Sequence, residues 1–178
     1  MDPAWVRLTL DVEKFNDDAF EDVVDRCRRN GIVFTTMAEL GDEEANHRRL
    51  YELNRTCSAD IPERGEFYTY DEFLAERIKR DTYDPNTVVL ALDGAKWVGM
   101  SAASDDRDGG YFFNEMTGVL SSHRRRGIAL AMKVIMIKRV RELGAPTMRT
   151  FHHPDNAGPI ALNRRLGYID AETPPPTS

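Results

Sequence analysis

Residues 117–133 read TGVLSSHRRRGIALAMK, and this stretch changes character twice along its length. The apolar run from Tyr111 to Leu120 predicts a strand, the polar residues 121–126 predict a turn, and a helical pattern begins at Gly127. The first N–H groups of a helix have no intrahelical partner and carry the positive end of the helix dipole, so they attract anions. A strand, a basic turn and a helix in this order therefore predict an anion site.

The residue types in the turn favour a phosphate ligand. Gly127 allows the backbone to approach a ligand closely, Ala129 keeps the next contact small, and Arg124, Arg125 and Arg126 supply positive charge. We therefore expect a ligand that carries a pyrophosphate. Two alternatives stay open on spacing alone: a solvated arginine-rich loop, and a glycine that only caps the helix. The stretch has neither the Gly-Lys-Ser/Thr ending of a Walker loop nor a G-x-G-x-x-G motif.

The motif Arg124-x-x-Gly127-x-Ala129, after a strand that ends Thr117-Gly118-Val119, resembles the acyl-CoA motif of the GNAT superfamily of N-acetyltransferases. That motif is usually Arg or Gln-x-x-Gly-x-Gly or Ala. A later stretch agrees with it: Asn156 and Asn163, followed by Leu166-Gly167-Tyr168, resemble the GNAT helix that flanks the pantetheine arm of the cofactor. The resemblance implies acetyl-CoA as the acyl donor.

The resemblance extends from about Phe112 to Tyr168, and the N-terminal third of the chain matches only the general plan. GNAT domains normally end in an apolar strand, whereas here only residues 168–171 precede the final prolines. Either that strand is very short, or the predicted strand at 5–12 completes the sheet edge. The extra strand makes the chain similar to the C-terminal half of tandem-GNAT proteins, in which such a strand ends the preceding domain.

Length and composition indicate one soluble domain with a sizeable core, since 41% of the 178 residues are hydrophobic and 30% are charged. A formal net charge of -6 argues against generic nucleic-acid binding. Cys27 and Cys57 suggest neither a disulfide framework nor a metal site, and the histidines lack metal-ligand spacing. The N-terminus lacks a signal-peptide pattern, and the apolar run 128–137 is shorter than the roughly 20 residues that span a bilayer. We expect a cytoplasmic protein that binds neither nucleic acid nor membrane.

The pattern of elements predicts an α+β fold with a mixed, mostly antiparallel central sheet flanked by helices, as the resemblance also implies. Strands are predicted at 5–12, 32–36, 87–92, 96–103, 111–120 and 148–151. Helices are predicted to follow the caps Asn16, Asp42, Thr69, Gly127 and Asn156. Thr69 and Glu72 form a capping-box pattern, and Asp93-Gly94-Ala95 is the expected hairpin turn. We expect an extension at 1–31, a GNAT domain at 32–173 and a flexible tail at 174–178.

The resemblance implies that the strand around Thr117 to Leu120 separates from its neighbour at a bulge, so that its free backbone groups bind pantetheine and the Val119 N–H stabilises the oxyanion. Lys133 could reach a cofactor phosphate, or it could be a surface lysine. The residues expected to contact acetyl-CoA are Val119, Leu120, Arg124, Arg125, Arg126, Gly127, Ile128, Ala129, Lys133, Asn156 and Asn163.

The candidate catalytic base is Glu115, the acid inside the central strand. Strand alternation places it on one face with Phe113, Thr117 and Val119, where it could take a proton directly or through water. The alternative is that Glu115 pairs with an arginine or faces solvent. GNAT enzymes often place this base elsewhere on the strand.

The candidate acid is less clear. Asn163 stands where many GNAT enzymes carry a tyrosine that protonates the departing thiolate, and an amide cannot deliver a proton. Asn156 and Asn163 are seven residues apart on one helical face, so they are better suited to orienting the cofactor. Tyr168 and Tyr111 are outside candidates.

The segment from Cys57 to Tyr70 is the expected acceptor wall. Asp60, Glu66 and Tyr68 in it would suit a cationic amine, and an acidic surface is the alternative. We expect an acetyl-CoA-dependent N-acetyltransferase that acts on a small amine, such as an antibiotic or a metabolite. Direct attack is expected because neither cysteine is expected to lie near the cofactor motifs. A degenerate GNAT domain that binds acyl-CoA as a regulatory or partner-binding module is the alternative, and a homodimer is one assembly that the sequence leaves open.

Overall fold

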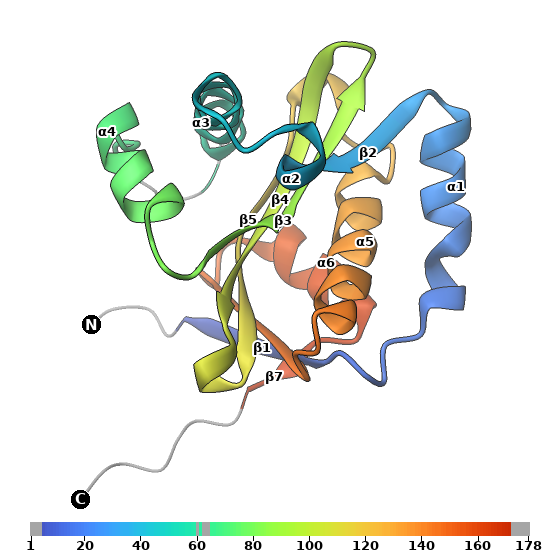
Figure 1. The fold of residues 1–178 in the computed structure, drawn as a ribbon. Coiled ribbons are helices and arrows are strands. Elements are labelled where there is room, and N and C mark those ends of the chain that lie inside the picture. Colours follow the sequence, from blue (N-terminus) through green and yellow to red (C-terminus); the bar gives the residue numbers. More distant parts are fainter. Residues whose placement is uncertain (1–4, 60, 62–64, 172–178) are drawn as a thin grey trace, which may run out of the picture.

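The computed structural model describes residues 5–59, 61 and 65–171. Within these residues, seven strands form one sheet in the order β2-β3-β4-β5-β6-β1-β7, with helices on both faces (Figure 1). All neighbouring strands are antiparallel except β5 and β6. The predicted α+β class with a mixed, mostly antiparallel sheet is therefore confirmed.

The strands begin and end close to the predicted positions. They are β1 (Val6–Asp11), β2 (Ile32–Thr36), β3 (Tyr83–Asp93), β4 (Lys96–Asp106), β5 (Tyr111–Val119), β6 (Thr147–His152) and β7 (Ile169–Asp170). Asp93 pairs with Lys96, so Gly94 and Ala95 form the hairpin turn as predicted. β3 extends into residues 83–86, which were predicted as loop, because Tyr83 pairs with Ser104 of the longer β4.

The N-terminal strand completes the sheet. β1 pairs with β6 from Val6 to Asp11, and on its other side Leu8 and Thr9 pair with β7, which contains only two residues. Leu8 and Leu10 are buried, whereas Arg7 and Asp11 are exposed, so the alternation of β1 matches its position in the sheet. Both explanations proposed for the short C-terminal strand therefore apply. β7 is very short, and β1 lies between β7 and β6.

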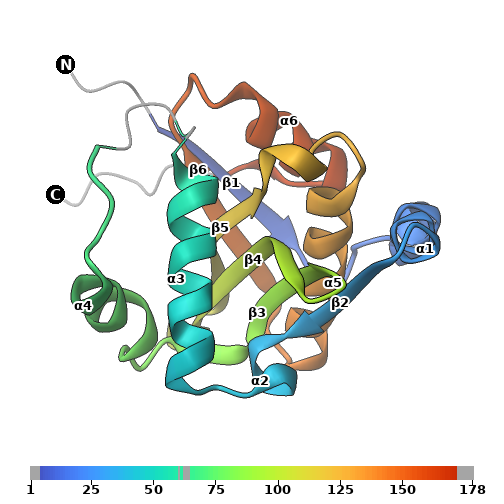
Figure 2. The same ribbon diagram turned by 90° about the horizontal axis from the view of Figure 1, so that it is seen from above.

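The helices are α1 (Glu21–Arg29), α2 (Met37–Leu40), α3 (Glu44–Ser58), α4 (Tyr70–Phe73), α5 (Ile128–Glu142) and α6 (Ala157–Leu166). α3 and α4 cover one face of the sheet, and α1, α5 and α6 lie on the other (Figure 2). Each face has its own core of buried apolar side chains. No helix in the described part of the chain has the length and apolar content needed to cross a bilayer.

Of the predicted side-chain caps, only that of Thr69 is present, as a complete capping box with Glu72. Asn16 and Asn156 lie at helix starts but make no side-chain cap bond, and a 3₁₀ turn (Asp17–Phe20) precedes α1. Asp42 was wrongly predicted as a cap. α3 starts after Glu43, and the Asp42 carboxylate accepts a hydrogen bond of 2.7 Å from the Tyr83 hydroxyl instead.

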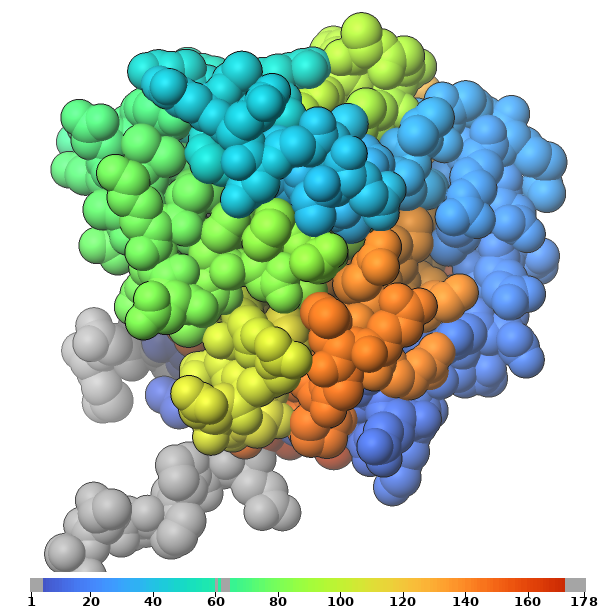
Figure 3. Space-filling model, in the orientation of Figure 1, coloured from blue at the N-terminus to red at the C-terminus, as the bar shows by residue number. Residues whose placement is uncertain are grey.

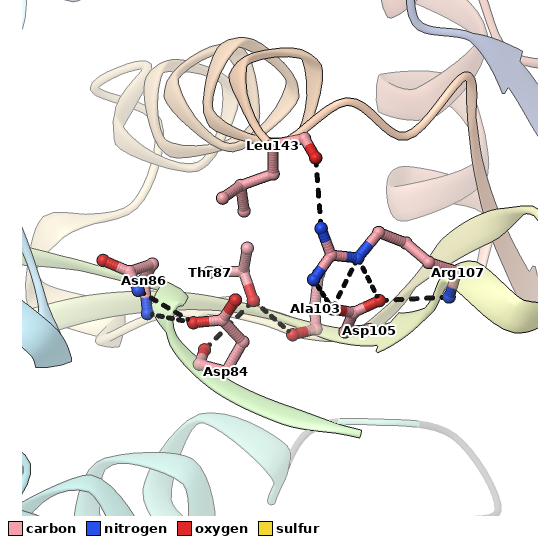
Figure 4. Close-up of polar contacts among 7 residues, drawn as sticks. All are labelled: Asp84, Asn86, Thr87, Ala103, Asp105, Arg107 and Leu143. Atoms are coloured by element: carbon pink, nitrogen blue, oxygen red, sulfur yellow. Dashed lines mark hydrogen bonds and ion pairs between the residues drawn. The ribbon is translucent and has the colours of Figure 1, made fainter. Parts of the chain in front are cut away.

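The central helix α5 is fixed at its C-terminal end. A guanidinium N–H of Arg107 donates to the Leu143 carbonyl at 3.1 Å, and Asp105 holds the same guanidinium in place (Figure 4). The chain around this end, orange in Figure 3, reaches the surface between α1 and the turn after β4. The N-terminal end of α5 follows β5 after the loop 120–127, where the anion site is predicted.

Candidate active site

A β-bulge interrupts the pairing of β4 with β5. Ala102 pairs with Met116 but Ala103 pairs with Asn114, so Glu115 is the extra residue. The side-chain amide of Asn114 donates to the Ala102 carbonyl at 3.0 Å and so replaces a backbone hydrogen bond at the bulge. Asn114 thus stabilises the irregular backbone from within the strand.

The bulge changes which side chains share a face. Met116 packs in the core beneath α3, whereas Val119 packs in the core beneath α5. Glu115 faces α3 and α4 together with Met116. The predicted common face of Glu115, Thr117 and Val119 is therefore wrong, because the extra residue shifts the alternation by one position.

β5 and β6 separate directly before the bulge. They pair only from Tyr111 to Phe113, after which the Thr150 hydroxyl donates to the Asn114 carbonyl at 3.2 Å. Neighbouring residues of an antiparallel strand turn their N–H groups to opposite sides. Because the Leu120 N–H donates to Val98 of β4, the Val119 N–H points away from β4, toward the gap. The gap thus contains backbone groups of β5 that β6 does not pair.

The loop after β5 has two residues in the left-handed region, Arg125 at φ 63° and Gly127 at φ 80°. A Cβ atom on Gly127 would lie 3.2 Å from Val23 of α1, so both the backbone angle and the packing favour glycine. The N–H groups of Ile128 and Ala129 lie in the first turn of α5, where no intrahelical acceptor is available. Left-handed turns that lead into a helix N-terminus are suited to binding phosphate.

Two arginines and both cysteines lie against the backbone of this loop and of the strand before it. Arg124 Nε donates to the Val119 carbonyl at 3.1 Å, and a guanidinium N–H of Arg126 donates to Ser122. The Cys27 thiol lies 3.5 Å from the Arg126 carbonyl. A Cβ on Gly118 would lie 2.6 Å from Cβ of Cys57. The expectation that both cysteines lie away from the cofactor motifs is therefore wrong, because the fold brings α1 and α3 against them.

Lys133 lies inside the protein, with 4% of its surface exposed. Its ammonium donates to Oδ1 of Asn114, and Nζ lies 5.9 Å from the centre of the Tyr168 ring. Burial lowers the pKa of Lys133 to about 7. The surface-lysine alternative is wrong, and this placement gives no support to a phosphate contact.

Asn163 is fully buried on α6, and its Nδ2 atom lies 2.8 Å from Nε2 of His152 in β6. Burial and, second, the charge of Lys133 lower the pKa of His152 to about 4, so the neutral ring accepts this hydrogen bond. Among the described residues, Asn163 Oδ1 has no hydrogen-bond partner. A buried acceptor without a donor in the protein is available to a water molecule or a ligand.

Glu115 faces a pocket between α3 and strands β3, β4 and β5. Its carboxylate accepts hydrogen bonds from Arg77, with which it forms an ion pair, and from the Ser104 hydroxyl at 2.8 Å. The alternative that Glu115 pairs with an arginine is confirmed. The pocket also includes residues from α3, β3 and the π-helical turn Leu74–Ile78, which follows α4.

The predicted acceptor residues are spread out. Asp60 lies outside the described residues, and Glu66 is exposed. The Tyr68 carbonyl accepts a 2.7 Å hydrogen bond from the Tyr51 hydroxyl, and its ring centre lies 5.7 Å from the guanidinium carbon of Arg77. Of the three, Tyr68 is therefore the one that the structure connects to the Glu115 pocket.

Sequence reasoning missed four residues of this region: Arg77, Ser104, Asn114 and His152. A signal existed for Asn114, which is a polar residue beside Glu115 in an otherwise apolar strand. His152 was considered only as a metal ligand. Arg77 and Ser104 meet Glu115 across long stretches of sequence, and no local pattern marks them.

A comparison with protein families decides what this arrangement represents. Residues 47–168 match the family described as the acetyltransferase (GNAT) family. The chain belongs to the GNAT family. Members of this family are in general acyl-CoA-dependent N-acetyltransferases. No curated protein sequence is similar enough to count as a relative.

Solved GNAT structures share the fold. The chain superposes on a GCN5-related N-acetyltransferase from Sphaerobacter thermophilus with a TM-score of 0.67 and 18% identity, covering 95% of this chain and 49% of that one. For a tandem GNAT protein from the clavulanic acid biosynthesis pathway, the TM-score is 0.65 and the identity 19%, with 95% of this chain and 50% of that chain covered. This chain thus spans about half of each.

A third structure is the diaminobutyrate acetyltransferase from Paenibacillus lautus, solved with L-2,4-diaminobutyric acid and coenzyme A. Its TM-score is 0.56 and its identity 23%, covering 75% of this chain and 73% of that one. At such identities the likeness shows the fold alone.

Proposed function

We propose that this GNAT domain transfers an acetyl group from acetyl-CoA to the amine of a small molecule, such as an antibiotic or a metabolite. The observation that carries the proposal is the gap between β5 and β6, which ends at the left-handed turn before α5. An extended thioester arm fits a gap lined by backbone N–H groups, and a pyrophosphate fits the helix N-terminus.

The residues on both sides of the gap suit coenzyme A. In this proposal the N–H groups of Gly127, Ile128 and Ala129 bind the pyrophosphate, with Arg124, Arg125 and Arg126 around it. The backbone of Val119 and Leu120 binds the pantetheine arm from the β5 side. On the α6 side, Asn156 and Asn163 face the arm, and the unpartnered Oδ1 of Asn163 offers an acceptor to one of its amide N–H groups.

Transfer would proceed by direct attack of the amine on the thioester. The Val119 N–H stabilises the negative charge that develops on the carbonyl oxygen. Glu115 takes the proton that the amine loses, directly or through water. Cys27 and Cys57 are both buried, and burial raises the pKa of the Cys27 thiol, so neither is suited to carry an acetyl group.

The pocket at Glu115 is the proposed acceptor site. The pocket lies on the α3 face of the sheet. Glu115 is the bulge residue of β5, the strand that borders the gap. In this proposal the amine lies beside Glu115 and competes with Arg77 for its carboxylate, and the Tyr68 ring packs against the Arg77 guanidinium. Asp60 and Glu66 remain, from the sequence, the candidate acidic contacts of a cationic amine.

The test is release of coenzyme A thiol from acetyl-CoA across a panel of amines. Relatives in fold act on different amines, including glucosamine, the alanine terminus of a ribosomal protein and L-2,4-diaminobutyric acid. The panel therefore contains amino sugars, alanyl peptides, diamino acids and polyamines. We expect release that depends on one class and an acetylated amine detected by mass spectrometry. Failure to bind acetyl-CoA would contradict the proposal.

A second candidate is a degenerate domain that binds acyl-CoA without turnover, as a regulatory or partner-binding module. Asn163 in place of the tyrosine and the ion pair that engages Glu115 favour it. Tight acetyl-CoA binding in calorimetry, with no thiol release on any amine class, would support this candidate over the enzyme.

A further inference from the structure

We propose that Lys133 is the general acid of this domain, which gives a proton to the departing thiolate of coenzyme A in place of the tyrosine that Asn163 replaces. The inference rests on the proposed function, because it assumes that the thioester lies in the gap between β5 and β6. It assigns a catalytic role to a side chain that was expected only at the cofactor phosphates or the surface.

The position of the ammonium group is the first support. Lys133 bonds to Asn114, the first residue of β5 after its last pair with β6. Tyr168 lies on another side, with its ring centre 5.9 Å from Nζ. Burial and, second, the charge of Lys133 lower the pKa of His152 of β6, which contacts Asn163. The ammonium therefore lies at the point where the two strands separate, between side chains from both sides of the gap.

The environment of Lys133 is the second support. Among the described residues, Lys133 donates to the neutral amide of Asn114, and no carboxylate forms an ion pair with it. A buried ammonium without a counter-ion is costly, and such groups are concentrated at functional sites. Asn163 Oδ1, buried and without a partner on the neighbouring helix, points independently to a ligand with a hydrogen-bond donor here.

The other titratable groups around Lys133 are poor proton donors. His152 has a pKa lowered to about 4, so it is neutral at neutral pH. The Tyr168 hydroxyl is directed at the sulfur of Met148, and burial raises its pKa well above the usual range. Lys133, with a pKa lowered to about 7, holds a proton that it can release at neutral pH. It therefore meets the requirement for a general acid near the working pH.

The proton balance of the step is simple. The amine nitrogen forms a bond to the acetyl carbon, the carbon–sulfur bond breaks, and its electron pair stays on sulfur. Lys133 gives one Nζ proton to that sulfur and becomes a neutral amine that still donates to Asn114. Glu115 takes the proton lost by the amine on the opposite face of the sheet. Lys133 regains a proton from solvent after coenzyme A leaves.

The test follows the lysine ε-carbon resonances of the full chain during titration with coenzyme A and, separately, with desulfo-coenzyme A. Lys133→Arg identifies the Lys133 signal by its loss, and Lys138, further along α5, serves as the reference lysine. We expect coenzyme A to shift the Lys133 signal and its titration, whereas desulfo-coenzyme A binds but leaves both nearly unchanged. Equal responses to the two ligands, or no response, would overturn the inference.

The outcomes separate this inference from the proposed function. If neither ligand binds, the proposed function fails. If both bind without a sulfur-dependent response at Lys133, only the role of Lys133 fails. With an amine that turns over, Lys133→Met should lower kcat by about 10²–10⁴-fold and remove the fall in rate at alkaline pH. Lys133→Arg keeps the positive charge but should not restore the fall in rate at alkaline pH. Lys138→Met should behave as wild type.

Discussion

Glu115 shows how one extra residue in a strand can place a functional group. The bulge directs its carboxylate to the α3 face, where Arg77 and Ser104 hold it. Glu76 also faces this pocket but is mostly exposed and pairs with Arg80. The two acids therefore differ in exposure and in their arginine partner.

Glu115→Gln should lower kcat by about 10²–10⁴-fold and leave acetyl-CoA affinity unchanged, because it removes the proton acceptor but keeps the size of the side chain. The measurement is steady-state thiol release with the best amine of the panel, with calorimetry for the cofactor. Glu76→Gln is the matched control and should change kcat little. A loss of only a few-fold in Glu115→Gln would leave this carboxylate with an orienting role.

The burial of Lys133 should also appear in the pH dependence of stability. Its pKa falls from 10.5 to about 7 on folding, so between these values the unfolded chain binds more protons. The free energy of unfolding should therefore rise with pH across this window. Lys133→Met should be more stable than wild type near neutral pH, and the difference should shrink toward about pH 9.

Urea denaturation at the two ends of this window measures that difference. Lys138→Met, further along the same helix, should keep the wild-type slope. His152 titrates mainly below the window, because its pKa moves from 6.5 to about 4. Parallel slopes in wild type and Lys133→Met would show that Lys133 does not change its charge in this range.

The candidate site could be proposed from sequence where its geometry is local. Arg124, Gly127 and Ala129 lie within six residues at a strand–helix junction, and this pattern together with the family resemblance predicted an anion site. The partners of Glu115 and Lys133 were not predictable, because Arg77, Asn114 and His152 meet them only through tertiary packing. The resemblance implied a bulge on this strand, but its position at Glu115 was not predictable, since the pairing with β4 defines it.

At the scale of elements, the strands and the main helices followed from hydrophobic periodicity, whereas of the predicted side-chain caps only the Thr69 capping box formed. Asp42 has the residue type of a cap but bonds to Tyr83 of β3, which only the folded sheet brings near. The position of β1 was left open for a related reason. Its alternating pattern identifies a strand, but the choice of neighbours depends on which edge remains unpaired.

β1 should contribute strongly to stability, because it connects β6 to β7 and buries Leu8 completely. Leu8→Ala should lower the free energy of unfolding by about 2–5 kcal/mol. The adjacent Arg7→Ala, on an exposed position of the same strand, should change it by less than about 0.5 kcal/mol. Urea denaturation of both variants measures this contrast, and a loss below about 1 kcal/mol for Leu8→Ala would mean that β1 is dispensable.

At the scale of the whole molecule, the sheet separates two chemically different sites. The buried cluster of Lys133, Asn163 and His152 lies on the face of α5 and α6, and the Glu115 pocket lies on the face of α3. The bulge and the gap between β5 and β6 are where these sites approach each other. In the proposed function, the thioester and the amine would enter from different sides of the sheet and meet at β5.

The most direct test of this account is a crystal structure of the protein with coenzyme A. We expect the pyrophosphate on the N–H groups of Gly127 to Ala129, the pantetheine arm between β5 and β6, and the sulfur beside Lys133 and Asn163. Coenzyme A bound away from the gap, for example in the groove lined by Arg48, Arg49 and Lys96, would contradict the account.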